Sequence, residues 1–340
     1  GIIVGGITLT GLGLRMTDFV EFVSQGNVIV MLLFTAFVCL VLGLGVPTTA
    51  NYVLVATLMA PVVVELGAQS GLIIPLIAVH LFVFYYGIMG DITPPVGLAS
   101  FAAAAISGED AIKTGIQGSL YALRTVVLPF IWIFNPQLLL IGVHGPMELL
   151  RVVFACTIAT LVFAAVTLGW FRLKSRWWEN VLLTFAVVLL FRPDFFMDRV
   201  AAEFREVPAS QVFEVARSVA EGESLVMVIK GTTLEGDDVS KTVAVQLGPV
   251  NADGRRRLAD AGMQLVPLGT QVQIGAVRFG SQARKAGVEQ GWEVQAVKVP
   301  TGRASPHWFY LPGLLLIGVV WLTQGRRSRT QVTPDPTKHA

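Results

Sequence analysis

The stretch that decides the fold is "YGIMGDITPPVGLASFAAAA", residues 86–105. It lies in one of the most apolar regions of the chain, yet it contains two adjacent prolines, three glycines and one aspartate. Each proline removes a backbone N–H donor, and the residue before a proline is pushed out of the helical region. The sequence therefore predicts that a membrane helix opens over residues 90–97.

The composition is that of an integral membrane protein. Of the 340 residues, 54% are hydrophobic and 14% are charged, and the mean hydropathy is +0.67. An average soluble protein has about 25% charged residues. The net charge of +2, with no basic stripe, gives no indication of a nucleic-acid partner. Cys39 and Cys156 each lie in an apolar run, which favours core thiols over a disulfide or a metal pair.

Most of the chain consists of apolar segments that approach or reach the ~20 residues needed to cross a bilayer. They lie at residues 27–44, 48–66, 72–89, 98–106, 125–141, 149–171, 178–191 and 308–322. The interval 198–306 is different, because it contains 13 Lys or Arg and 13 Asp or Glu residues, with short β-prone runs between turns. This interval is predicted to be a soluble, mostly β domain held between two membrane anchors.

Loop charges predict which side of the membrane each part faces, because short loops rich in Lys and Arg stay inside. "FRLKSR" at 171–176 and "GRRSR" at 325–329 are therefore placed inside, so the interval 198–306 lies outside. The loop that carries Lys113 is also inside, two spans before "FRLKSR". The loop "GVHGPME" between those spans has no Lys or Arg, as expected for an external loop.

A second interruption lies upstream, in "VLGLGVPTTANYVLV" at residues 41–55. Glycines and Pro47 separate two apolar arms, and Thr48, Thr49 and Asn51 follow at the start of the second arm, where they can cap it and offer oxygens to a ligand. A pair of Gly/Pro-interrupted apolar segments is typical of the binding site of a secondary transporter. Either break taken alone is equally well explained as a simple kink.

The two breaks together define the candidate binding residues. An opened helix frees carbonyl oxygens, which are ligands for a hard cation, and the segment that begins near Leu98 directs its positive end at the same point. An aspartate at this depth costs about 2.5–3.5 kcal/mol on an insertion scale, so Asp91 is expected to bind a cation, carry a proton or cap the broken helix. The candidates are Gly45, Thr48, Thr49, Asn51, Gly90, Asp91, Thr93, Pro94, Pro95 and Gly97. His80 is expected to be a packing residue, and Glu65 is expected to lie at a membrane–water interface.

Four long motifs give the chain a family resemblance: "LTGLGLRMTDFVEFVSQGN", "LGLGVPTTANYVLVATLMAPVVVELG", "HLFVFYYGIMGDITPPVGLASFAAAAISGED" and "FIWIFNPQLLLIG". Together they resemble the C-terminal half of the large membrane subunit of TRAP transporters, in the fused permeases that work with TAXI-type periplasmic binding proteins. The resemblance covers residues 1–142. We therefore expect the chain to be the C-terminal portion of a longer permease.

The resemblance implies a polytopic α-helical membrane protein with an elevator-type ion-transporter fold. A re-entrant hairpin would occupy about residues 27–66, and a broken helix crossing once would occupy about residues 72–106. Backbone carbonyls and hydroxyls would hold Na⁺ at Gly45, Thr48, Gly90 and Thr93. Asp91 departs from the family pattern, in which small or apolar residues are usual at this position.

The resemblance also implies the function and its partners. The chain would be a component of a sodium-coupled importer in the bacterial inner membrane, with Na⁺ as the coupling ion and no other cofactor. It would import an organic acid delivered by the periplasmic binding protein. The first repeat and the small membrane subunit would complete the permease.

Residues 143–340 are predicted to extend this core. Two further membrane helices are expected at 143–197, the external domain at 198–306, and a last membrane helix with a cytoplasmic tail at 307–340. Residues 268–299, "LGTQVQIGAVRFGSQARKAGVEQGWEVQAVKV", resemble part of a PDZ-type domain. Such a domain could bind the binding protein by strand addition, or it could only cover the external face.

A membrane-anchored, PDZ-containing sensor, scaffold or quality-control protein is the alternative function. A quality-control protease would need a catalytic motif, and the sequence contains neither HExxH nor GxSxG. We therefore expect a transporter and not an enzyme.

Overall fold

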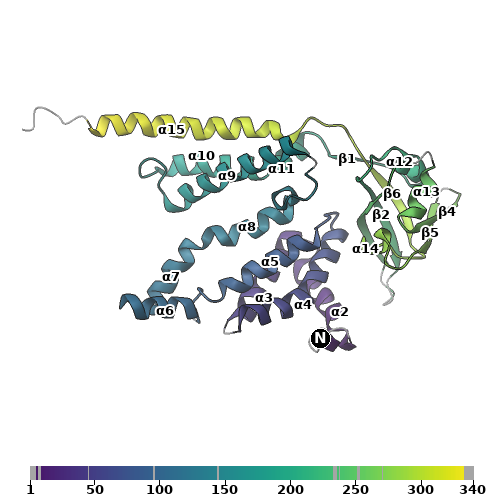
Figure 1. The fold of residues 1–340 in the computed structure, drawn as a ribbon, viewed down its shortest axis with the longest axis horizontal. Helices are drawn as coiled ribbons and strands as arrows, with labels where there is room; N and C mark the ends of the chain where they lie inside the picture. The colour runs from purple at the N-terminus through teal and green to yellow at the C-terminus, as the bar shows by residue number, and fades with distance from the viewer. Residues whose placement is uncertain are drawn as a thin grey trace, which may run out of the picture. The chain divides into compact units, whose positions relative to one another are not determined.

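The structure is a computed structural model that describes residues 5–6, 9–44, 46–94, 96–143, 145–232, 236, 238–250, 253–269 and 271–332. The chain forms two compact units, each assembled from separate segments. The first contains Gly1–Thr35, Leu54–Leu76 and Ala202–Arg303, and the second contains Ala36–Val53, Ile77–Ala201 and Ala304–Ala340. The expected combination of an apolar helical region with a small antiparallel β domain is confirmed (Figure 1).

Helices α2 to α8 make up most of the described residues in the first part of the chain, and the proline-bearing motifs interrupt them. They are α2 (Leu12–Ser24), α3 (Val28–Gly43), α4 (Thr48–Gln69), α5 (Leu76–Met89), α6 (Leu98–Ser107), α7 (Ala111–Tyr121) and α8 (Leu123–Phe134). The helix stops at Met89 and resumes at Leu98, so the interruption covers the residues at which the sequence predicts it. The earlier interruption separates Gly43 from Thr48.

The predicted span at residues 125–141 is displaced in the structure. The apolar helical stretch begins at Ala111, where the Asp110 side chain caps it by accepting the backbone N–H of Lys113 at 2.8 Å, and it ends at Phe134. Pro136 then starts a 3₁₀ turn, η1 (Pro136–Leu139), because proline cannot donate to the preceding helical turn. The sequence estimate followed hydropathy alone and missed both the cap and the stop.

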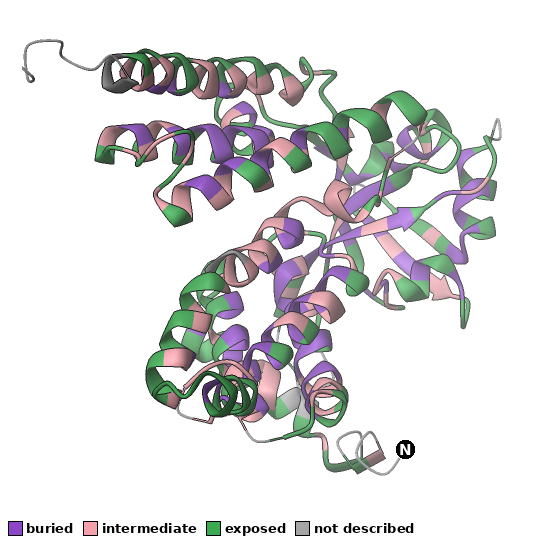
Figure 2. Cartoon of the chain, turned by 60° about the vertical axis from the view of Figure 1, so that its left-hand side comes forward, coloured by how far each residue is buried: buried purple, intermediate pink, exposed green. Residues whose placement is uncertain are grey.

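The rest of the helical region consists of α9 (Pro146–Leu168), α10 (Trp177–Phe191), α11 (Pro193–Val200), the turn η3 (Pro306–Phe309) and α15 (Tyr310–Val332). Helix α10 packs against both α9 and α15, and their buried residues include Ala159, Leu183, Leu190 and Val320. Helix α11 bends away from α10 by 78° at Pro193. The outer faces of these helices remain exposed and apolar, as expected for lipid-facing surfaces (Figure 2).

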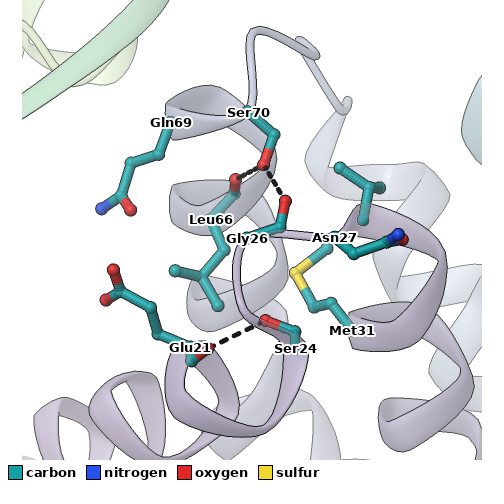
Figure 3. A pocket seen from close by; sticks show the side chains of 9 residues that line it. Glu21, Ser24, Gly26, Asn27, Met31, Leu66, Gln69 and Ser70 are labelled. Carbon is teal, nitrogen blue, oxygen red and sulfur yellow. Dashed lines mark hydrogen bonds between the residues drawn. The ribbon is translucent and has the colours of Figure 1, made fainter.

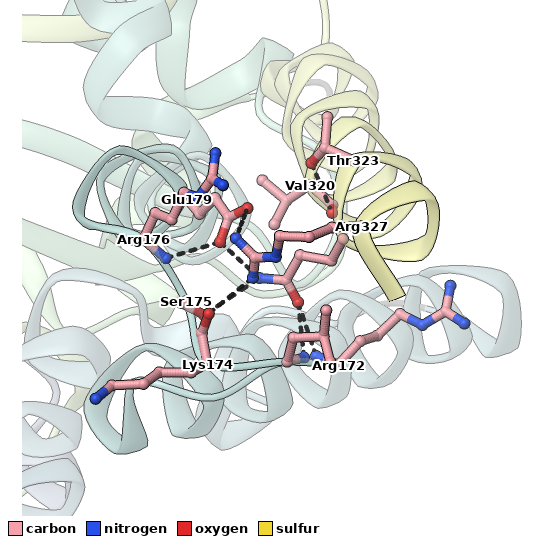
Figure 4. A network of polar contacts seen from close by, with 10 residues as sticks. Arg172, Lys174, Ser175, Arg176, Glu179, Val320, Thr323 and Arg327 are labelled. Atoms are coloured by element: carbon pink, nitrogen blue, oxygen red, sulfur yellow. Dashed lines mark hydrogen bonds and ion pairs between the residues drawn. The ribbon is translucent and has the colours of Figure 1, made fainter. Parts of the chain in front are cut away.

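A buried polar network joins the α9–α10 turn to α15 (Figure 4). Glu179 is 1% exposed, and its carboxylate accepts hydrogen bonds from the backbone N–H of Arg176 at 2.8 Å, Gln324 Nε2 at 2.8 Å and Arg327 at 3.3 Å. Gln324 is fully buried, and its Oε1 accepts the backbone N–H groups of Arg172 at 2.9 Å and of the next residue at 3.0 Å. The network therefore fixes the last membrane helix to the turn that the charge pattern places inside.

The β domain is a six-stranded antiparallel sheet in the order β3-β2-β6-β5-β4, with β1 also paired to β6. The strands are β1 (Phe204–Pro208), β2 (Ser224–Thr232), β3 (Asp238–Gln246), β4 (Met263–Leu268), β5 (Gln271–Val277) and β6 (Glu293–Pro300). Three helices, α12 (Val212–Ser218), α13 (Gly254–Asp260) and α14 (Gln282–Lys285), complete it. Its buried core contains Met227, Ile229, Val245 and Val297.

Within the stretch that resembles a PDZ domain, β5, a turn, α14 and β6 follow one another in the expected order. Helix α13 packs on α12, and Arg257 is buried with its guanidinium donating to the carbonyls of Ala216 at 2.7 Å, Val219 at 2.6 Å and Gly248 at 2.8 Å. This arginine closes the C-terminal end of α12, whose last carbonyls have no partner within the helix.

The Glu179 network generates a stability prediction. Gln324→Leu should lower the free energy of unfolding by about 2–3 kcal/mol, because two backbone N–H groups and one carboxylate lose a buried partner. Thermal unfolding in detergent measures the loss, followed with a thiol-reactive dye that reaches the buried Cys39 when the protein unfolds.

Thr323→Val is the matched control, since the hydrogen bond that the Thr323 hydroxyl donates goes to the Val320 carbonyl of its own helix, at 3.0 Å. Equal unfolding temperatures for Gln324→Leu and Thr323→Val would contradict the role assigned to the network.

Candidate functional site

The two interrupted segments meet backbone to backbone in the second unit. A Cβ atom added to Gly90 would lie 2.7 Å from the carbonyl oxygen of Gly43 and 2.8 Å from its carbonyl carbon. A Cβ atom added to Gly43 would in turn lie 3.0 Å from the carbonyl oxygen of Gly87. These approaches are possible only without side chains, so the glycines of both motifs are required where the chain segments touch.

Asn51 occupies the centre of this meeting point. Its Nδ2 lies 2.9 Å and 3.0 Å from the positions that Cβ atoms on Gly43 and Gly87 would take, and it donates to the carbonyl of Cys39 at 3.4 Å. The side chain is 0% exposed, and its Oδ1 has no hydrogen-bond donor among the described residues. A buried acceptor without a partner costs about 1–3 kcal/mol, so this oxygen requires an explanation.

The backbone of the second interruption is folded back on itself. The carbonyl of Asp91 accepts the backbone N–H of Ala99 at 3.0 Å, and the carbonyl of Ile92 accepts the Ser100 hydroxyl at 3.0 Å. The carbonyl of Met89 accepts the Thr93 hydroxyl at 2.6 Å. The carbonyl oxygens of Asp91 and Ile92 each keep a second lone pair, which can still face a cation. The Met89 carbonyl is fully used, because it also accepts the backbone N–H groups of Ile92 at 3.2 Å and Thr93 at 3.1 Å.

Asp91 and Gly97 have different roles at this interruption. Gly97 is the N-cap of α6 with φ 31°, a left-handed conformation that favours glycine, and no side chain caps the helix. The carboxylate of Asp91 therefore does not cap α6, although the sequence allowed for that role. Asp91 is half-buried, and cation binding and proton transfer remain predictions for it.

The remaining predicted residues lie around this point or outside the described structure. Thr48 is half-buried at the first position of α4, and Thr49 is exposed. Pro94 packs against α7, where a Cβ atom on Gly115 would lie 2.8 Å from the proline ring. Gly45 and Pro95 lie outside the described residues.

Three contributing residues were missed by the sequence analysis: Gly87, Ser100 and Gly115. Gly87 and Gly90 are three residues apart and therefore share one face of a helix, a signal that the sequence did contain. No local sequence pattern identifies Ser100 or Gly115. Their roles come from contacts with Ile92 and Pro94, and these contacts form only when the interrupted segment folds. His80 contacts the Tyr52 hydroxyl through Nδ1 at 3.0 Å, as expected for a packing residue.

A small pocket of about 180 Å³ lies in the first unit, between the α2–α3 turn and the end of α4 (Figure 3). The Ser70 hydroxyl there contacts the carbonyls of Gly26 at 3.2 Å and Leu66 at 2.9 Å, and the Ser24 hydroxyl contacts the carbonyl of Glu21 at 3.3 Å. The pocket contains none of the residues predicted from the two interruptions.

The atoms that could coordinate a ligand at the meeting point are amide, hydroxyl and carbonyl oxygens. Hard cations prefer oxygen ligands of these kinds. Within the described ranges, no group of three His, Cys, Asp or Glu residues could hold a metal ion. The positive end of α6 begins at the same interruption and favours an anion there. The arrangement is therefore suited to a hard cation and an adjacent anionic group.

Comparison with protein families gives two matches that meet near the start of α9. Residues 149–330 match the family described as "Domain of unknown function (DUF3394)". Residues 1–147 match "Tripartite ATP-independent periplasmic transporter, DctM component". Comparison with curated proteins and with solved structures gave no match.

The glycine contact generates the second prediction. Gly90→Ala should destabilise the protein by about 1–3 kcal/mol, because the new methyl group overlaps the Gly43 backbone, which cannot rotate away. The measurement is the thermal unfolding temperature in detergent.

Gly118→Ala is the control, because the nearest atom to its added Cβ, the Ser100 hydroxyl oxygen, lies 3.9 Å away. If Gly90→Ala is tolerated as well as Gly118→Ala, the two interruptions do not touch as described.

Proposed function

The chain belongs to the DUF3394 family and carries a DctM component before that domain, and we propose that it works as the permease of a sodium-coupled TRAP transporter. The resemblance of the first part to a TRAP large membrane subunit is confirmed by the DctM match, as is the expected class, a transporter permease and not an enzyme. A TRAP permease works with a periplasmic binding protein and the other TRAP components. In our proposal that binding protein is of the TAXI type and delivers an organic acid.

One observation carries the proposal: the buried, unpartnered Oδ1 of Asn51 lies where two interrupted helices meet. Among the described residues no donor reaches this oxygen, and an apolar side chain would fill the same space without the desolvation cost. A bound cation would give this oxygen its partner. In this proposal Asn51 is therefore a ligand of the coupling ion, together with backbone carbonyls of the two interruptions.

The Na⁺ site that we propose uses Gly45, Thr48, Gly90 and Thr93, with Asn51 beside them. Thr93 supports this assignment because its hydroxyl proton is used on the Met89 carbonyl, which leaves its oxygen lone pairs for a cation. Thr49 lies at the start of α4, just after the first interruption, and Gly97 lies at the end of the second interruption, as the N-cap of α6. The carboxylate of the substrate would approach the start of α6, where the helix dipole is positive.

Helix lengths support the hairpin and broken-helix arrangement. Helix α3 has 16 residues, α5 has 14 and α6 has 10, whereas ~20 residues are needed to cross ~30 Å of hydrocarbon at 1.5 Å per residue. Helices α3 and α4 would form the re-entrant hairpin, and α5 with α6 the broken helix that moves with it. Transport by an elevator motion follows from this arrangement in our proposal.

The proposed location is the bacterial inner membrane, with the β domain in the periplasm. The charge pattern that supports it is the basic turn at Arg172, Lys174 and Arg176, which the polar network ties to α15. The first repeat and the small membrane subunit would be supplied by other parts of the permease. The external domain would then face the binding protein.

The second candidate is a membrane-anchored sensor, scaffold or quality-control protein. It is favoured by the β domain, whose order of elements fits a PDZ-like module. The two functions differ in one property, because only the transporter requires a sodium site at Asn51.

The third prediction concerns sodium. In proteoliposomes that contain the complete permease and its binding protein, Asn51→Ala should raise the sodium concentration for half-maximal uptake at least ~10-fold, since one ligand worth ~1.4 kcal/mol or more is lost. Dicarboxylates and acidic amino acids are the uptake probes.

Stabilisation of the chain by NaCl relative to KCl during thermal unfolding gives a second measurement that needs no substrate. Sodium responses of Asn51→Ala that equal those of Gly118→Ala would overturn the site.

The fourth prediction separates cation from proton coupling at the second interruption. Thr93→Ala should weaken the sodium dependence of uptake, because the hydroxyl oxygen is a proposed ligand. Asp91→Asn should do the same if its carboxylate binds Na⁺, and should instead alter the pH dependence if it carries a proton. The site over residues 90–97 would be wrong if neither change affected sodium dependence or pH dependence.

A further inference from the structure

Lys241 lies on strand β3 at a position that points toward the core of the β domain. Side chains alternate along a strand, so Lys241 shares a face with Val243 and Val245, which are 3% and 0% exposed. The Lys241 side chain is 5% exposed. Strand β3 is also an edge of the sheet, because it pairs with β2 alone. A nearly buried ammonium at a core-facing edge position needs a partner.

Within the β domain, the Lys241 ammonium packs on an aromatic ring, but the carboxylate that the domain provides lies farther away. Trp292 lies flat against β2, since a Cβ atom on Gly231 would fall 2.2 Å from its ring. The Lys241 ammonium lies 4.7 Å from the centre of the Trp292 ring, a cation–π distance. Among the described residues of the domain, the carboxylate that pairs with Lys241 is that of Glu289, at 3.8 Å.

The closest partner of Lys241 comes from the membrane region. Both carboxylate oxygens of Glu65, on the last turns of α4, lie near the ammonium, at 3.1 and 3.2 Å. In the turn after α4, Gly71 faces Thr242, since a Cβ atom on Gly71 would lie 3.9 Å from the Thr242 hydroxyl oxygen. Both segments belong to the same compact unit. Lys241 therefore contacts α4 through Glu65, and Thr242 lies beside the turn that follows α4.

An independent argument puts these two segments on one side of the membrane. The loop charges place the interval 198–306 outside and Lys113 inside. If α5 and α6 form one broken helix that crosses once, as in the proposed function, then the turn before α5 is also outside. The ion pair thus joins parts of the chain that the charge pattern brings to the same side.

We propose that the end of α4 and the turn after it, residues 65–71, are the docking surface for the β domain, and that Lys241 is its anchoring residue. The Lys241–Glu65 pair neutralises the buried ammonium, and the turn covers the edge strand β3. In the transporter this contact fixes the external domain to the outer end of the hairpin formed by α3 and α4. Movement of the hairpin then carries the domain with it or has to break the pair. This consequence and the placement of the turn outside the membrane rest on the proposed function, whereas the Lys241–Glu65 contact does not.

A lysine on an edge strand has another known use, to prevent pairing with a second sheet. In that case Lys241 would not depend on Glu65, and the docking surface would not exist. The two explanations predict different neighbours for the ammonium, which can be tested chemically.

Zero-length cross-linking of the full chain in lipid vesicles with a carbodiimide tests the docking directly. The reagent activates a carboxylate and joins it to an adjacent amine, so mass spectrometry should find Lys241 linked to Glu65. A link between Lys241 and Glu289 within the β domain is the internal control for reactivity. Glu65→Gln should abolish the first link and keep the second. A Lys241–Glu289 link without any Lys241–Glu65 link would overturn the proposal.

Charge exchange provides a second test that does not depend on cross-linking. Lys241→Glu should speed amide hydrogen exchange in residues 66–72 and in β3 at least ~10-fold, and adding Glu65→Lys should bring the rates back to within ~2-fold of the original. Lys230→Glu is the matched control, because Lys230 is exposed on β2 and pairs with Asp238 of the same domain at 3.5 Å. Fast exchange throughout the β domain would reveal unfolding, and in that case the Glu65→Gln cross-linking result decides.

These outcomes are separate from those of the transport assay. Loss of sodium-dependent uptake with an intact Lys241–Glu65 link overturns the transporter and leaves the docking surface. Normal uptake with no such link and no effect of Lys241→Glu on residues 66–72 overturns the docking surface and leaves the transporter.

Discussion

Hydrocarbon does not hydrogen-bond to a protein backbone, and the architecture around residues 90–97 is a response to that constraint. Prolines remove donors and open the helix, so every carbonyl exposed by the opening needs another partner. Ser100 and Thr93 supply two of them through their hydroxyls, and the backbone N–H of Ala99 supplies a third. The interrupted segment is thus an ordered, non-helical structure inside the membrane region, and hydrogen bonds between residues close in sequence stabilise it.

Two buried polar groups in this chain, the Glu179 network and Asn51, differ in whether their hydrogen-bond acceptors have partners. In the Glu179 network the carboxylate of Glu179 and the amide oxygen of Gln324 both accept hydrogen bonds, some of them from backbone N–H groups of the turn, and the result is a fixed connection between two helices. At Asn51 the amide donates to Cys39, but its oxygen has no donor among the described residues. A satisfied network stabilises a packing, whereas an open acceptor at the junction of two interruptions is suited to a ligand.

The β domain follows the same electrostatic rule outside the membrane. Lys241 lies at a core-facing position, where its charge is tolerated because an aromatic ring and two carboxylates surround it. One of those carboxylates belongs to the domain and the other to the end of α4. An isolated β domain would lose the closer of the two carboxylates, which favours association with the helical region.

Much of this protein was determined by its sequence alone: the membrane class, the positions of both interruptions, the β character of residues 198–306 and the relationship of the first part to TRAP permeases. These properties depend on composition, local periodicity and the restricted geometry of proline and glycine, which act over a few residues. The start of the span at Ala111 and its end at Phe134 were missed, because a capping aspartate and a proline-initiated turn outweighed hydropathy. Only the tertiary structure decided that Gly90 touches Gly43, that Asn51 keeps an open oxygen between them, and that Lys241 meets Glu65. Those contacts join residues that are tens to more than a hundred positions apart, and their partners are selected by the packing of whole segments, for which no local pattern in the chain carries a signal.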